Sequence, residues 1–226
     1  MGVMDFEQFK EFFIKIILPA TLATIRMVLI VVVVGFSLGF IVGSLLYYYS
    51  DSGLKPNRLV YKIISFFVNI IRSIPILLLI VALIPLTRII VGTSIGPNAV
   101  IVPLSVGAMG FTARYIEGVF NNVDPLLIEA ARSYGATSID ILKEIVYKES
   151  VPGIISAIII VIVNNIAGST IAGAVGGGGI GAIAINYGYQ SFNNTILYSS
   201  VFILYIMVQC VQGIGNTIYA KSLKKQ

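Results

Sequence analysis

The most distinctive chemical pattern in this sequence is a short polar segment, Glu129-Ala130-Ala131 followed by Gly135, in an otherwise apolar chain. The short alanine side chains allow another protein surface to approach closely, and Glu129 places a charge where a helix N-terminus favours it. Other chemistry is excluded by residue type. The sequence has no histidine, a single cysteine (Cys210) and no GxxxxGK[ST] phosphate loop. We therefore predict a protein-docking segment, with no catalytic residue and no metal site.

The composition places the rest of the chain in a lipid bilayer. Of its 226 residues, 57% are apolar and 11% are charged, whereas about a quarter of the residues of a soluble domain are charged. The net charge is +5, but no basic face with interleaved aromatic residues is present, so nucleic acid is not expected as a partner. These values exclude a soluble enzyme domain and a disulfide-stabilised secreted module.

Long uncharged stretches predict an all-α, polytopic fold with five transmembrane helices. A helix needs about 20 apolar residues to cross the bilayer, and the alternating pattern of a membrane barrel is missing. Pro75 is expected to kink the second span. The predicted spans are residues 20–48, 61–86, 95–118, 152–174 and 195–218.

Charge and hydrophobic periodicity predict how the two ends of the chain lie relative to the membrane. Residues 1–19 are predicted to be an interfacial segment, in which 5–17 form either an amphipathic helix or an early extension of the first span. Ten Lys and Arg residues fall on the side of the 1–2 and 3–4 connections and the basic tail 219–226, against three on the other side. By the positive-inside rule the N-terminus is outside and the C-terminus is cytoplasmic.

Residues 114–149 carry ten of the 25 charges and are predicted to be water-exposed helices on the cytoplasmic side. Asp124-Pro125 suits the start of a helix over 125–134, which Gly135 would end. Thr137 would begin a second helix, with Asp140 completing a capping box. The predicted apolar stripe of this second helix is Ile139, Leu142, Ile145 and Val146.

Small and polar residues inside the spans leave alternatives open. Gly35, Gly39 and Gly43 form a tandem GxxxG pattern that packs helices either within the chain or against another chain. Arg72 is interpreted as reaching the lipid headgroups or bracing a neighbouring chain. Polar groups within the fourth span either face a pathway or join helices. These candidate pathway residues are Asn164, Asn165, Ser169 and Thr170.

A glycine-rich segment follows the fourth span. Glycine frees the backbone for irregular turns, so this segment is predicted to shape the outer mouth or a re-entrant segment, the alternative being a flexible loop. Its residues are Gly176, Gly177, Gly178 and Gly179.

The segment Glu129-Ala130-Ala131, with Gly135, Ile145 and Pro152-Gly153, resembles the EAA loop of permease subunits of ABC-type importers, although Tyr147-Lys148 stands where the family usually has Leu-Pro. The string from Arg72 to Pro75 and the glycine-rich segment are similar to those of methionine importer permeases. The resemblance implies a type I ABC importer permease fold and a homodimer in the bacterial cytoplasmic membrane. It also implies two ATP-binding subunits that hold ATP and Mg, and an extracytoplasmic methionine-binding protein. The residues it implies for coupling to the ATPase are Glu129, Ala130, Ala131, Gly135, Thr137, Ile139 and Leu142.

Three other functions remain open at this point. The chain could serve an importer for another amino acid, act as a channel or carrier that needs no ATP, or be a membrane scaffold that transports nothing. The third to fifth spans contain no acidic residue before Glu117, at the cytoplasmic end of the third. This absence weighs against a proton-coupled carrier, which usually needs titratable groups within its spans.

Overall fold

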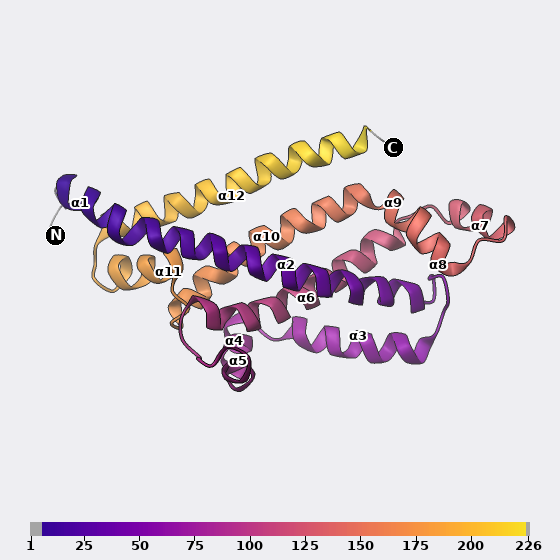
Figure 1. Ribbon diagram of the computed structural model, residues 1–226, viewed down its shortest axis with the longest axis horizontal. Coiled ribbons are helices and arrows are strands. Elements are labelled where there is room, and N and C mark those ends of the chain that lie inside the picture. Colours follow the sequence, from indigo (N-terminus) through magenta and orange to yellow (C-terminus); the bar gives the residue numbers. More distant parts are fainter. Residues whose placement is uncertain (1–5, 225–226) are drawn as a thin grey trace.

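The computed structural model describes residues 6–224, in which all regular elements are helices, and the long helices lie side by side along one long axis (Figure 1). Residues 1–5 of the predicted N-terminal segment and residues 225–226 of the predicted tail lie outside this range. The N-terminal end of the described chain lies at one end of the long axis, and the short helices α7 and α8 lie at the other (Figure 1). The expected all-α fold is confirmed.

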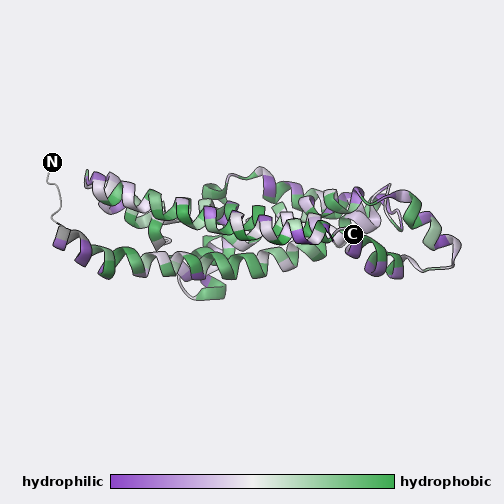
Figure 2. Cartoon of the chain, turned by 90° about the horizontal axis from the view of Figure 1, so that it is seen from above, coloured by the Kyte–Doolittle hydropathy of each residue, from purple (hydrophilic) through white to green (hydrophobic). Residues whose placement is uncertain are grey.

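The first span is one continuous helix from Lys10 to Tyr49. The helical run that contains this span begins at Phe6 and comprises α1 (Phe6–Phe12), the π-helical stretch η1 (Phe13–Ile17) and α2 (Leu18–Tyr49). No break separates the described part of residues 5–17 from α2, so this part is helical and continuous with the span, while its predicted place at the membrane interface stays a prediction. Hydrophobic residues dominate along the long helices (Figure 2).

The second predicted span, 61–86, is broken rather than kinked. The chain forms α3 (Arg58–Ser73), α4 (Ile76–Ala82) and α5 (Ile84–Val91), and the axes of α3 and α4 meet at 105°. Pro75 lacks an N–H donor and disfavours helical backbone in the preceding residue, and Ile74 is indeed extended. Within residues 6–224, four helices are therefore long and apolar enough to cross a membrane, or five if the bent pair is one span.

The third span, α6 (Pro97–Asn121), packs tightly along α2. A methyl group at Gly35 would lie 2.6 Å from the Ala108 Cβ, and one at Gly43 would lie 2.6 Å from the Ala113 carbonyl oxygen. These glycines let the two backbones approach closely, which is the favoured arrangement between apolar helices in lipid. The tandem GxxxG pattern thus serves packing within the chain.

The C-terminal half contains α10 (Val151–Ala174), α11 (Gly179–Ile183), η3 (Ala184–Tyr189) and α12 (Asn194–Leu223). The glycine-rich segment is an ordered turn between α10 and α11, in which Gly176, Gly178 and Gly179 have φ of +85°, +69° and +73°. The Gly96 N–H donates to the Gly176 carbonyl (2.8 Å), and the Ile180 N–H donates to Thr24 Oγ1 (2.9 Å). These bonds tie the turn to α2 and to the start of α6, unlike a flexible loop.

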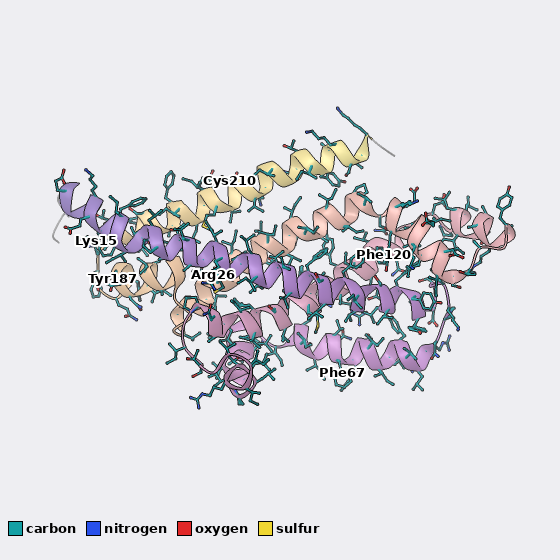
Figure 3. The ribbon with its side chains drawn as sticks, in the orientation of Figure 1. Lys15, Arg26, Phe67, Phe120, Tyr187 and Cys210 are labelled. Atoms are coloured by element: carbon teal, nitrogen blue, oxygen red, sulfur yellow. The ribbon has the colours of Figure 1, made fainter. Side chains whose placement is uncertain are left out.

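The outer surfaces of the bundle are apolar. Phe67 lies on the face of α3 directed away from the other helices, and Cys210 lies on α12, where its side chain is exposed (Figure 3). Only 11% of the most apolar window of α12 is buried within the chain. Such surfaces suit contact with lipid or with another membrane-embedded chain.

Candidate functional site

Residues 124–149, called the insert below, form a helical knob at one end of the bundle (Figure 1). It contains α7 (Pro125–Ser133), α8 (Ser138–Ile141), the π-helical stretch η2 (Leu142–Val146) and α9 (Tyr147–Glu149). The helix starts are as predicted. Asp124 accepts a hydrogen bond from the Leu126 N–H (2.9 Å), and Thr137 and Asp140 form a capping box.

Two features fix the turn between the helices of the insert. Gly135 has φ of +82°, a left-handed conformation that glycine adopts without steric cost, and its N–H donates to the Arg132 carbonyl (2.9 Å). The hydrogen bonds that Asp140 accepts from Thr137 hold the pKa of the Asp140 carboxyl below its usual range, because they favour the ionised form. Gly135 thus ends the first helix of the insert, as predicted.

The insert is anchored to the bundle by an apolar cluster and by one shared backbone acceptor. Tyr47, Phe120, Ile141 and Val146 are buried together, and the rings of Tyr47 and Phe120 pack edge to face with centroids 5.7 Å apart. Figure 3 shows Phe120 where α6 approaches the insert. The Leu54 carbonyl, between α2 and α3, accepts hydrogen bonds from Arg132 (3.0 Å) and Ser138 (3.3 Å).

The predicted coupling residues fall on two faces of the insert. Glu129, Ala130 and Ile139 are exposed, and so is the capping residue Thr137, whereas Ala131 and Leu142 are half-buried against the apolar cluster. Sequence reasoning missed further exposed apolar residues. They are Leu126, 69% exposed, and Tyr134, 92% exposed. With Ala130 between them, these residues stand at positions i, i+4 and i+8, and this spacing in the sequence could have indicated a shared helix face.

The predicted stripe of the second helix is partly wrong. Ile139 is 55% exposed, and Ile141, which was not predicted, is buried instead. The cause is the π-helical geometry of η2, where the Tyr147 N–H donates to the Leu142 carbonyl five residues earlier. A π turn places residues five apart on the same face, so Ile141 shares the buried face with Val146.

A cavity of about 520 Å³ lies within the membrane-spanning part, between α3, α4, α6 and α10. Arg72, Asn164 and Asn165 contribute to its wall, and the rest of the lining is apolar or glycine. Asn165 is buried and its Nδ2 donates to the Val161 carbonyl (2.8 Å), whereas Asn164 is exposed. Ligand pockets in proteins have volumes of about 300–1,000 Å³ and this same mixture of apolar wall and few polar groups.

The four candidate pathway residues are therefore not brought together. Asn164 and Asn165 both contribute to the cavity. Ser169 and Thr170 do not contribute to its wall, and their hydroxyls donate to the Ile166 carbonyl at 2.6 Å and 3.3 Å. Such bonds to the preceding turn satisfy a hydroxyl within its own helix.

A polar network between α3 and α6 was missed in the sequence. The Arg114 guanidinium donates to Glu117 Oε2 (2.7 Å), to the Tyr61 hydroxyl (3.2 Å), to Asn69 Oδ1 (3.0 Å) and to Ser65. The side chains of Arg114 and Glu117 are 18% and 8% exposed. The sequence could have indicated this network, because Tyr61, Ser65 and Asn69 stand at positions i, i+4 and i+8, a spacing that puts them on one face of a helix.

Comparison with known proteins agrees with this architecture. Residues 51–219 match the family described as binding-protein-dependent transport system inner membrane component. A protein of Vibrio cholerae, named probable D-methionine transport system permease protein MetI, is 40% identical over 218 residues, covering 95% of this chain and 97% of that protein. The methionine import system permease protein MetP of Bacillus subtilis is 40% identical over 77% of this chain and 78% of its own length.

Solved structures show the same fold. A chain of the MetNI methionine ABC transporter in an inward-facing conformation superposes with a TM-score of 0.89 at 38% identity, covering 92% of this chain and 96% of that chain. An amino acid ABC transporter solved with histidines gives a TM-score of 0.74 at 18% identity, which supports the fold alone. With several apolar spans, an exposed helical insert and these relatives, this multi-pass membrane chain belongs to the family of inner membrane components of binding-protein-dependent transport systems.

Proposed function

We propose that this chain is the permease subunit of an ABC importer for methionine. In this proposal it forms a homodimer with two ATP-binding subunits, which hold ATP and Mg, and it receives methionine from an extracytoplasmic binding protein. The similarity to MetI and MetP, over most of each chain, supports the substrate. The observation that carries the coupling role is the insert, whose exposed face has small and apolar residues around Ala130.

The mechanism is alternating access driven by the ATP-binding subunits. The insert docks on these subunits through Glu129, Ala130 and Ile139, while Gly135, Thr137, Ala131 and Leu142 hold the two helices in their relative positions. ATP binding brings the two inserts of the dimer together, and the spans open outward. The energetic basis is differential affinity, because ATP binds more tightly to the outward-competent state and so increases its population.

The orientation of the chain follows from the same assignment. Docking places the insert in the cytoplasm, together with the end of α12 that carries Lys221 and Lys224. The start of α1 lies at the opposite end of the long axis (Figure 1), so the proposal assigns it to the outside. The glycine-rich turn then faces the extracytoplasmic side, where its ordered backbone shapes the outer mouth near the binding protein.

The cavity beside Asn164 and Asn165 is the part of the pathway that this chain contributes. Its apolar wall suits a thioether side chain, and its polar groups suit the charged end of an amino acid. Ser169 and Thr170, whose hydroxyls bond within α10, are assigned to helix structure rather than to the pathway.

The test is uptake of labelled L-methionine into proteoliposomes that contain this chain, its ATP-binding subunit and its binding protein. Uptake is expected only with ATP and all three components, and unlabelled D-methionine tests whether the other enantiomer competes. Hydrolysis of ATP on addition of the binding protein without methionine entry would retain the coupling role and exclude methionine as the substrate. Uptake without an ATP-binding subunit would identify a carrier and overturn the proposal.

A further inference from the structure

Arg72 lines the cavity from near the C-terminal end of α3, and its side chain is exposed in the single chain. It is the penultimate residue of α3, and about 21 Å of helix separates it from Arg58 at the other end. It packs near Gly110, which lies near the middle of α6, and it shares the cavity with Asn164, near the middle of α10. An ionisable side chain at the centre of a bilayer about 30 Å thick is costly and marks a functional site by default.

The charge of Arg72 has no compensating group nearby. None of the residues that line the cavity is acidic, and within residues 6–224 the Arg72 guanidinium has neither a hydrogen bond nor an ion pair. The other deep arginine, Arg114, differs in this respect because it is paired with Glu117 and three further side chains. The interpretation of Arg72 as a headgroup-reaching residue stays a prediction, which the experiment below tests.

We propose that Arg72 binds the α-carboxylate of the transported amino acid at the middle of the membrane. The guanidinium presents a planar set of N–H donors that matches a carboxylate in a two-pronged hydrogen bond. Asn165 Nδ2 is already bonded to Val161, so its side-chain oxygen remains as an acceptor for the α-ammonium, and Asn164 supplies a second amide. Leu104, Phe111 and Ile76 provide the apolar wall for the substrate side chain.

This inference rests on the proposed function in one respect, which is that the cargo is an amino acid. It adds the residue that recognises the α-carboxylate of the transported amino acid. It therefore predicts that the permease itself binds free amino acid weakly, without the binding protein. The break between α3 and α4 at Pro75 leaves the last carbonyls of α3 without helical donors, which further suits a cationic group beside the cavity. Broken helices at the membrane midplane are a recurrent setting for transport sites.

The experiment measures equilibrium binding of labelled L-methionine to the permease–ATPase complex in nanodiscs, without the binding protein. L-methioninol, which has the ammonium and thioether but no carboxylate, serves as the competing probe. The variants are Arg72→Gln and Arg72→Lys. The matched control is Arg88→Gln on α5, because Arg88 does not line the cavity and bonds to Ser94 instead.

We expect Arg72→Gln to weaken methionine binding about tenfold or more, as loss of a charge-assisted hydrogen bond requires, and Arg72→Lys to weaken it less. Methioninol is expected to bind equally to the wild type and to Arg72→Gln, because it lacks the group that Arg72 recognises. The Arg88→Gln variant is expected to bind methionine as the wild type does. Equal loss of both ligands in Arg72→Gln, or no loss of either, would overturn the assignment.

Two further outcomes separate this inference from its alternatives. If Arg72 instead binds a lipid phosphate, adding phosphatidylglycerol to phosphatidylcholine nanodiscs would leave methionine binding unchanged. Arg72→Gln would then reduce the binding of that lipid only. If Arg72 braces a second copy, Arg72→Gln would dissociate the permease dimer; either result overturns the inference. Failure of the proposed function is distinct, because then the wild-type complex with its binding protein would not import methionine.

Discussion

Gly39 of α2 lies so close to Thr112 of α6 that a methyl group on Gly39 would stand 2.5 Å from the Thr112 Cβ. Real Cβ atoms do not approach one another to this distance, so any side chain at position 39 must push the two helices apart. Since α2 and α6 pack extensively against each other, this contact, together with those at Gly35 and Gly43, sets the spacing of the two helices.

The first prediction is that Gly39→Ala destabilises the protein by about 1–3 kcal/mol, the usual cost of overpacking a close contact. The measurement is thermal unfolding in detergent followed by circular dichroism, in which Tm should fall. Gly213→Ala on α12 is the matched control, because a Cβ there meets nothing within 4 Å. An unchanged Tm for Gly39→Ala would show that α2 and α6 can separate without cost.

The second prediction concerns the turn of the insert. Gly135→Pro removes the N–H that bonds to Arg132 and fixes φ near −65°, whereas Gly135 has φ of +82°. We expect ATP-dependent uptake to be lost while the chain still inserts in the membrane. Gly135→Asn is the control, because asparagine tolerates left-handed backbone and should retain most of the uptake. Uptake at the wild-type level in Gly135→Pro would exclude a role of this turn in coupling.

The third prediction tests the exposed face of α7. Ala130→Arg places a long charged side chain where another surface must approach, so co-purification of the ATP-binding subunit should fall about tenfold or more. Ala220→Arg makes the same change at an exposed position of α12 and should leave co-purification intact. If size-exclusion chromatography showed that Ala130→Arg still assembles normally with the ATP-binding subunit, the docking surface would have to lie elsewhere on the chain.

The fourth prediction concerns the ion pair between Arg114 and Glu117. Removing one partner leaves the other charge buried without compensation, which costs about 3–5 kcal/mol, whereas replacing both with apolar residues removes that penalty. Arg114→Met should therefore lower Tm more than Arg114→Met combined with Glu117→Met. Thermal unfolding of the two variants is the measurement, and a Tm of the double variant at or below that of Arg114→Met would contradict the prediction.

The fifth prediction follows from the lowered pKa of Asp140. A carboxyl whose pKa is lower in the folded state stabilises that state above its unfolded pKa, and this contribution is lost as the pH falls through the folded value. The capping box should therefore weaken when the pH falls well below 4, the region of an ordinary Asp pKa of about 3.9. Hydrogen exchange of the insert amides measures the change, and Asp140→Asn should remove this pH dependence.

Much of this architecture could be predicted from the sequence, because uncharged stretches, caps and glycines act locally. The start of α7 at Asp124-Pro125 and the capping box of Thr137 and Asp140 are formed as predicted. The π-helical geometry of η2 could not be predicted, since it depends on how Ile141 and Val146 pack against the bundle. A one-residue phase shift of this kind leaves no mark on hydrophobic periodicity.

The same holds for the site residues, because those with a local feature in the sequence could be predicted and those that depend on tertiary packing could not. Asn164 and Asn165 were recognised as candidates because polar groups are unusual inside a span. The position of Arg72 beside the cavity could not be predicted, because it depends on where α3 begins and on the 105° bend at Pro75, neither of which its neighbours in the sequence specify. The partners of Arg114 on α3 lie 45 to 53 residues away along the chain, beyond any local pattern.

The Leu54 carbonyl has a mechanical consequence, because it accepts hydrogen bonds from both helices of the insert. The insert is joined covalently to α6 and α10 alone, yet through Leu54 it is also joined to the hairpin of α2 and α3. A force applied at the tip of the insert is therefore distributed to four helices at once, including the one that carries Arg72. We therefore expect a movement of the insert to displace these four helices together.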